Sequence, residues 1–91
     1  MHAIVWDPDK ARANHEKHRV RFSDAEVALF DLNAITLEDE TSEGERRYIS
    51  IGMYALGRIL VVVFSYRGDD IRLISVRPAT RIERKSYEEG I

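Results

Sequence analysis

The longest uninterrupted apolar segment of the chain, residues 59–64 (Ile-Leu-Val-Val-Val-Phe), constrains the fold most strongly. A strand that is buried on both faces forms a continuous apolar run, whereas a strand with one solvent-exposed face alternates apolar and polar residues. The run is rich in β-branched residues, which favour strands. We therefore predict a central strand over residues 58–66.

The length and composition limit the kinds of protein that the chain can be. Ninety-one residues are enough for one domain and too few for two, so we expect a single domain over residues 1–91. The apolar run is far shorter than the roughly 20 residues that span a bilayer, and the N-terminus does not resemble a signal peptide. The chain has no cysteine, which excludes disulfides and thiolate metal sites. We expect a cytoplasmic protein with no membrane partner.

The remaining elements follow from periodicity and capping signals. Asp7 and Pro8 are typical of a helix start, and the motifs Ser23–Glu26 and Thr80–Glu83 match the capping box. We predict strands over residues 3–6, 34–38, 46–55 and 71–77 besides the central one, and helices from 8 to 17 or 18, over 24–31, and from 80 to about 90.

The order of these elements predicts the fold class. The order is β-α-α-β-β-β-β-α, and short turns join the last four strands. Short turns join antiparallel neighbours, so we expect a mainly antiparallel, twisted sheet with helices packed on it, which is an α+β fold.

The charges are distributed unevenly along the chain. The net charge is −2, but residues 1–45 carry five Lys or Arg against eleven Asp or Glu, whereas residues 46–91 carry nine against five. Eight of those nine cations are arginine, whose planar fork suits phosphate. The balance of +4 in the second half is compatible with a polyanion partner, and equally with an uneven but solvated surface.

Several segments, taken in order, resemble the BrnT toxin family. The matching segments are Trp6–Lys10, Ala13-Asn14, Lys17-His18, Val20, Phe22–Ala25, Glu45–Gly52, Arg67–Asp69, Ile71–Arg77, Ala79-Thr80, Glu83-Arg84 and Tyr87. One departure is Arg19, which stands where the family usually has glycine.

The resemblance implies a RelE-like fold and a toxin of a type II toxin–antitoxin system. It further implies an endoribonuclease that arrests translation and growth, with RNA as substrate and no cofactor. A ribbon-helix-helix antitoxin, similar to BrnA, would neutralise the toxin, and DNA would be contacted only through that antitoxin.

His18 is the best candidate for proton transfer in metal-free RNA cleavage, because the pKa of histidine lies near working pH. Lys10, Asn14 and His18 recur at helical spacing on one face, with Lys17 beside them, and we expect them to contact substrate. The alternative is a histidine that only complements the helix dipole. We expect His15 and His2 to be surface residues.

Arginines at strand ends are the candidates for phosphate binding. Arg67 and Arg77 end successive antiparallel strands, so hairpin geometry should place them at opposite ends of the sheet. Each could instead form a surface ion pair with Asp69, Asp70 or Glu45.

The C-terminal helix offers further candidates. Glu83 is a possible catalytic base, but it also serves a capping box, which needs no catalytic explanation. Arg81 and Arg84 are expected to bind substrate.

The sequence indicates no metal site, because His15 and His18 have no evident third ligand and the acidic residues 38–45 are typical of a solvated loop. The alternative to a ribonuclease is a non-catalytic module that binds nucleic acid or protein.

Overall fold

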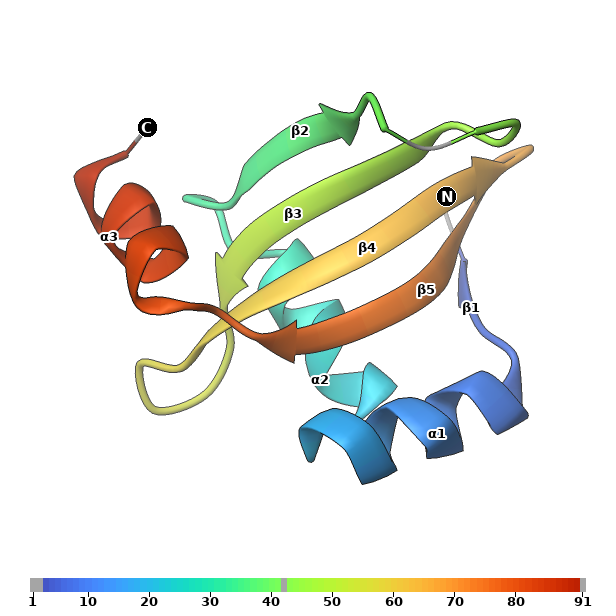
Figure 1. Cartoon of the computed structure of the whole chain (residues 1–91), viewed down its shortest axis with the longest axis horizontal. Coiled ribbons are helices and arrows are strands. Elements are labelled where there is room, and N and C mark those ends of the chain that lie inside the picture. The colour runs from blue at the N-terminus through green and yellow to red at the C-terminus, as the bar shows by residue number, and fades with distance from the viewer. Residues whose placement is uncertain (1–2, 42, 91) are drawn as a thin grey trace.

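The computed structural model describes residues 3–41 and 43–90, so His2 lies outside the described residues. The elements are β1 (Ile4–Val5), α1 (Pro8–His18), α2 (Phe22–Leu29), β2 (Ile35–Asp39), β3 (Arg47–Met53), β4 (Ile59–Arg67), β5 (Asp70–Pro78) and α3 (Arg81–Glu89) (Figure 1). The predicted order of elements and the α+β class are confirmed. No helix of the described ranges is long and apolar enough to cross a membrane.

The five strands form one sheet in the order β1-β5-β4-β3-β2, with β4 at its centre as predicted. Strands β2 to β5 form an antiparallel meander. Strand β1 pairs parallel to β5, with Ile4 opposite Ile71. The sheet is therefore mixed: three of its four strand pairs are antiparallel, in line with the expectation of a mainly antiparallel sheet, and the parallel β1–β5 pair was not predicted. The chain leaves β1, passes through both N-terminal helices and enters the meander at its far edge, so β1 ends up beside the last strand.

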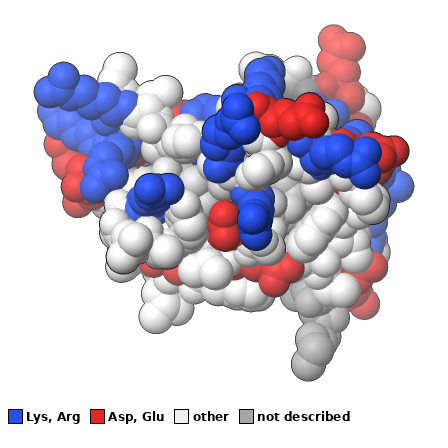
Figure 2. Space-filling model, turned by 90° about the horizontal axis from the view of Figure 1, so that it is seen from below, with Lys and Arg blue, Asp and Glu red and all other residues white. Residues whose placement is uncertain are grey.

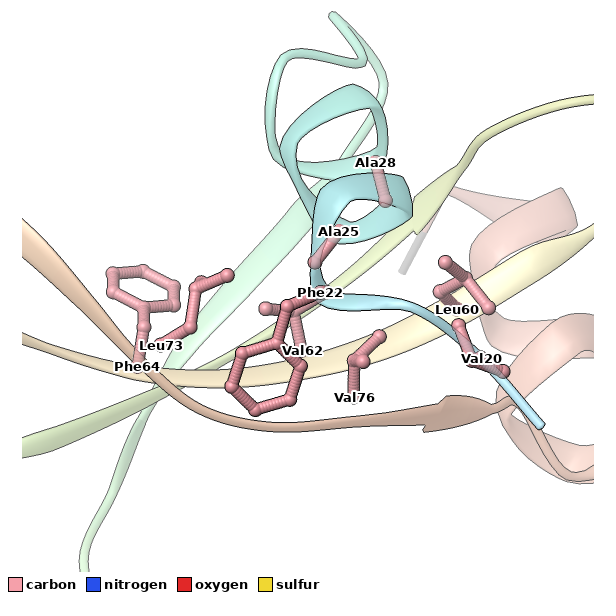
Figure 3. Close-up of a cluster of buried hydrophobic side chains, with 9 residues drawn as sticks. All are labelled: Val20, Phe22, Ala25, Ala28, Leu60, Val62, Phe64, Leu73 and Val76. Carbon is pink, nitrogen blue, oxygen red and sulfur yellow. The ribbon is translucent and has the colours of Figure 1, made fainter. Parts of the chain in front are cut away.

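The core lies between one face of the sheet and helices α1 and α2. Figure 3 shows the buried cluster, in which Phe22 and Ala25 of α2 meet Val62 of β4 and Val76 of β5. The helix approaches the sheet closely at Gly52, where a Cβ atom would lie 2.2 Å from the Ala28 carbonyl oxygen. Only glycine at this position of β3 permits that packing distance.

Helix α1 has the predicted limits and an unusual end. The Asp7 carboxylate accepts a hydrogen bond from the Asp9 backbone N–H at 2.8 Å, which caps the N-terminus. Arg19 closes the C-terminus in the left-handed conformation, with φ of 59°. Glycine adopts this conformation without strain, which explains why a helix of this kind usually ends in glycine. Here an arginine bears the strain.

The two capping-box predictions have different outcomes. Thr80 and Glu83 form the predicted box at the start of α3. Helix α2 begins at Phe22, with Arg21 at its N-cap and no side-chain cap, so the predicted start near Ser23 is wrong. The earlier start brings Phe22, which is 2% exposed, into the core against the Trp6 ring. Burial of this aromatic ring outweighs the roughly 1 kcal/mol that a side-chain cap contributes.

Candidate active site

A hollow of about 340 Å³ lies where the end of α1 faces the β3–β4 turn and the segment that joins β5 to α3. It is lined by His18, Arg19, Val20, Tyr54, Arg58, Ile59, Leu60, Pro78, Ala79 and Arg84. His18, the predicted proton-transfer residue, is partly buried at its rim, where helix α1 ends. We call this cavity the histidine hollow.

The charged side chains that line the histidine hollow are all cationic. Arg19, Arg58 and Arg84 contribute from three different elements, and none of the lining residues is Asp or Glu. Figure 2 shows basic side chains gathered at its left edge, on the side where Figure 1 places α3, and in further groups across that face. Arg84 also lies 3.8 Å from Glu88 Oε1 in an exposed ion pair outside the lining. The excess of cations on the lining favours an anion.

Tyr54 and Arg58 frame the turn at one wall of the hollow. The Tyr54 backbone N–H donates to the Arg58 carbonyl oxygen at 3.0 Å, and an Arg58 guanidinium N–H donates to the Tyr54 hydroxyl at 3.4 Å. Sequence reasoning missed Arg58 as a site residue. It follows a turn signal, Leu56-Gly57, but nothing local indicates that the turn faces the end of α1.

Arg77 and Glu83 form a two-pronged ion pair beside the histidine hollow. Arg77 Nη1 donates to Glu83 Oε1 and Nη2 to Oε2, each at 2.8 Å. The same carboxylate accepts the Thr80 backbone N–H at 2.8 Å. The Arg77 guanidinium, helped by Thr80, lowers the pKa of Glu83 to about 2, although burial opposes this. A carboxylate with so low a pKa is a weak base at neutral pH.

Arg77 does not line the histidine hollow. Its neighbour Val76 is buried in the core on the side of α1 and α2, and successive side chains of a strand point to opposite faces. The link between the two groups is α3, where Glu83 binds Arg77 and the next residue, Arg84, lines the hollow. The ion pair thus fixes the helix turn that presents Arg84.

A second contact holds the far end of α3. The Tyr87 hydroxyl donates to Asp31 Oδ2, which also accepts the Met53 backbone N–H at 2.9 Å. The hydrogen bond to Asp31 raises the pKa of Tyr87 to about 12. Burial raises the pKa of Asp31, but the hydrogen bonds that it accepts outweigh this and leave its pKa lowered. Because no residue of α3 is fully buried, these polar contacts fix the helix on the sheet.

Arg67 lies at the other end of the sheet, as the hairpin geometry predicts. It stands opposite Asp70 in the β4–β5 register, whereas Arg77 stands opposite Val61. Its guanidinium lies 3.4 Å from Glu45 Oε1, which also accepts the Ser65 hydroxyl at 2.8 Å. Arg67 is eight residues along β4 from Ile59 of the histidine hollow, roughly 27 Å of strand. The structure does not bring Arg67 together with His18.

The predicted polar face of α1 lines a second hollow, of about 240 Å³. Its walls are Lys10, Ala13, Asn14, Lys17, His18, Ile74 and Ser75. We call it the lysine hollow.

Asn14 differs from its neighbours on this face because it is only 8% exposed. Its amide N–H groups donate to the carbonyl oxygens of Val20 and Val76, and its oxygen accepts the Val76 backbone N–H. Val76 lies opposite Val62 of β4, and β1 pairs with β5 only at residues 71 and 72. The Asn14 amide therefore takes the place of a missing neighbour strand at this edge.

Two other candidates are exposed. Arg81, in the first turn of α3, is not among the residues that line either hollow. His15 is an exposed residue of α1, as expected. Within the described ranges, no three His, Cys, Asp or Glu side chains are placed to share a metal ion.

Comparison with solved structures indicates the class of protein. The chain matches the crystal structure of the Brucella abortus ribonuclease toxin BrnT with a TM-score of 0.71 and 27% sequence identity, over 89% of this chain and 100% of that chain. The fold is thus that of a small α+β ribonuclease toxin. No curated protein sequence matches the chain.

The family follows from the sequence itself. A family model described as the ribonuclease toxin BrnT of type II toxin–antitoxin systems matches residues 6–83. The chain belongs to the BrnT family, and the resemblance noted in its sequence is confirmed. The relation to RelE-like toxins stays a prediction.

Proposed function

We propose that the protein is a metal-independent endoribonuclease that cleaves RNA in the histidine hollow. The observation that carries this proposal is the hollow itself, where a partly buried histidine lies among three arginines with no carboxylate on the lining. Membership of a family of ribonuclease toxins supports RNA as the substrate.

The proposed reaction is attack of a ribose 2′-oxygen on the adjacent phosphorus. The new bond forms between the 2′-oxygen and phosphorus, the bond to the 5′-oxygen breaks, and the products are a 2′,3′-cyclic phosphate and a 5′-hydroxyl. The imidazole of His18 accepts the 2′-hydroxyl proton, and a water molecule donates a proton to the leaving 5′-oxygen on the opposite side of phosphorus. The imidazolium then returns its proton to the hydroxide that is left. Arg58 and Arg84 stabilise the additional negative charge on the pentavalent phosphate.

Arg77 and Glu83 have a positioning role in this proposal. Both terminal nitrogens of Arg77 are bound to Glu83, and Glu83 is too weak a base to take a proton from ribose at neutral pH. Together they fix the first turn of α3 and so the place of Arg84. This assigns to Arg77 and Glu83 an indirect part in catalysis in place of the direct one expected from the sequence.

The test is cleavage of naked RNA by purified protein in EDTA. We expect wild-type activity to survive EDTA and His18→Ala to lower the cleavage rate by about 100- to 10,000-fold, since proton transfer contributes that much. His15→Ala is the matched control, because it removes an exposed histidine from the same helix. Loss of wild-type cleavage in EDTA would refute metal independence, and full activity of folded His18→Ala would move the site elsewhere.

The biological part of the proposal is growth arrest relieved by an antitoxin. We propose that cleavage of cellular RNA inhibits translation and that a ribbon-helix-helix antitoxin binds the toxin and neutralises it. Membership of a type II family supports such a partner. Co-expression with the product of the neighbouring gene should restore growth and yield a co-purifying complex, whereas growth arrest that persists with no complex would contradict it.

A further inference from the structure

The histidine hollow and the lysine hollow meet at one residue. His18 lines both cavities, so they lie next to each other, one towards the β3–β4 turn and the other along the side of α1. We infer that the two hollows together form a binding track for single-stranded RNA, with the scissile phosphate at His18 and further phosphates at Lys17 and Lys10. The inference rests on the proposed function and extends it to the nucleotides beside the cut.

The charge of the track supports this inference. Its lining includes five cations and no Asp or Glu: Lys10, Lys17, Arg19, Arg58 and Arg84. Other hollows of the described surface are different, because one includes Glu88 and Glu89 and another includes Asp7. Several cations spread along two neighbouring hollows suit a chain of phosphates better than they suit one small anion.

Three of these cations come from the acidic half of the sequence. Lys10 and Lys17 lie on α1 and Arg19 follows it, while the carboxylates of residues 38–45 lie on β2 and in the β2–β3 loop, where Glu45 contacts Ser65 and Arg67 near the end of β4. Folding thus separates basic and acidic groups that are close in sequence. The lysines are exposed, and neither has a carboxylate partner within 4 Å among the ion pairs of the described residues.

The length of the track indicates how much RNA it holds. Lys10 and His18 are eight residues apart on one helix, which is about 12 Å at 1.5 Å per residue. That distance corresponds to about three nucleotides at the stacked spacing of about 3.4 Å. Tyr54 at the opposite end offers an aromatic ring on which an unpaired base can stack. Recessed cavities with such a ring favour an unpaired strand over a duplex.

The first test measures binding without cleavage. A fluorescent RNA octamer carrying 2′-O-methyl riboses has no attacking hydroxyl, so its anisotropy reports affinity alone. The double variant Lys10→Ala/Lys17→Ala should lower the slope of log Kd against log salt by about 1.4, which corresponds to about 25-fold weaker binding at 0.1 M salt. The control variant Arg12→Ala/Lys85→Ala removes two exposed cations from α1 and α3 outside the track and should keep the wild-type slope.

The second test compares substrates of different length. The wild-type protein should prefer an unmodified octamer to dinucleoside monophosphates, as judged by kcat/KM, and the Lys10→Ala/Lys17→Ala variant should lose about tenfold or more of that preference. Circular dichroism establishes that both double variants are folded.

The outcomes separate the track from the proposed function. If the wild type cleaves neither the octamer nor the dinucleoside monophosphates, the proposed function is refuted. The binding experiment with the methylated octamer still shows whether the track binds RNA. If the lysine variant binds the methylated octamer with the wild-type affinity and slope, or weakens no more than the control variant, the track is refuted. If a methylated duplex binds as tightly as the single strand, the assignment to single-stranded RNA is refuted.

Discussion

The Arg77 guanidinium and the Glu83 carboxylate join the end of β5 to the first turn of α3 through two parallel hydrogen bonds of 2.8 Å. Between them the chain turns through Pro78, Ala79 and the N-cap residue Thr80. The pair combines charge attraction with a fixed orientation, since a carboxylate matches the guanidinium fork in one plane. It is partly buried, so water screens it less than it screens the other ion pairs of α3.

This pair should make stability depend on pH in the acid range. The pKa of Glu83 falls from 4.5 to about 2 on folding, so its contribution is complete above about pH 4.5 and is lost as the pH falls towards 2. The Arg77 side chain is 38% exposed, so screening limits the contribution to about 1–2 kcal/mol. Glu83→Gln should lower the free energy of unfolding by that amount at pH 7 and by much less at pH 2. Urea titrations at both pH values measure this, and an equal loss at both would contradict the assigned cause.

Arg84 should matter for the chemical step although α3 is an exposed helix. Arg84→Ala should lower kcat about 100-fold, which is typical of removing one group that stabilises transition-state charge. Lys85→Ala is the matched control, because it removes the neighbouring cation, which lies outside the histidine hollow. Equal kcat values for the two folded variants would remove Arg84 from the proposed mechanism.

The sequence predicted the elements well where the signal is local. The apolar run Ile59–Phe64 forms the central strand, and the Thr80 capping box begins α3. The similar motif at Ser23 predicted a helix start that the structure does not have, because burial of Phe22 moves the start. A capping motif reports only the local contribution to the free energy, and tertiary packing decides between starts that differ by two residues.

The site was predictable only in part. His18 was proposed from the sequence because histidine suits proton transfer and because Lys10, Asn14 and His18 recur at helical spacing, and it does line the histidine hollow. Arg58 was missed because its partners in the histidine hollow are about 40 residues before it and 26 residues after it in the sequence. Asn14 was assigned to the substrate face because helical spacing cannot show whether an amide faces water or an open strand edge. The net charge of each half of the chain is also a poor guide to the basic surface. Helix α1 belongs to the acidic half, yet it supplies cations to the track.

Replacing Arg19 should stabilise the fold, because an arginine there adopts a left-handed conformation with φ of 59°. Such a conformation costs a residue with a Cβ atom roughly 1 kcal/mol. Arg19→Gly should therefore unfold at a temperature about 4–8 °C higher than Arg19→Ala, as expected for about 1 kcal/mol in a domain of this size. Both variants remove the same cation, so their difference isolates the backbone, and equal melting temperatures would contradict the strain.

Asn14 should be needed for folding rather than for binding RNA. Its amide makes three hydrogen bonds, to the Val20 carbonyl and to both polar groups of the Val76 backbone. Asn14→Ala leaves the Val76 N–H and carbonyl buried at a strand edge without their partner, and each such loss costs about 1–3 kcal/mol. We expect the free energy of unfolding to fall by about 2–4 kcal/mol in denaturant titrations.

Asn14→Asp distinguishes the structural role from a substrate contact more sharply. A carboxylate keeps the acceptor for the Val76 N–H, but it replaces two donated hydrogen bonds with repulsion from the Val20 and Val76 carbonyl oxygens. It should therefore be at least as unstable as Asn14→Ala at pH 7. For Asn14→Ala, which changes no charge, the affinity of the folded fraction for methylated RNA at low temperature should stay within about twofold of the wild type, since the amide is buried beneath the lysine hollow. If Asn14→Ala kept wild-type stability and lost RNA binding, Asn14 would be a substrate contact, as the sequence alone had predicted.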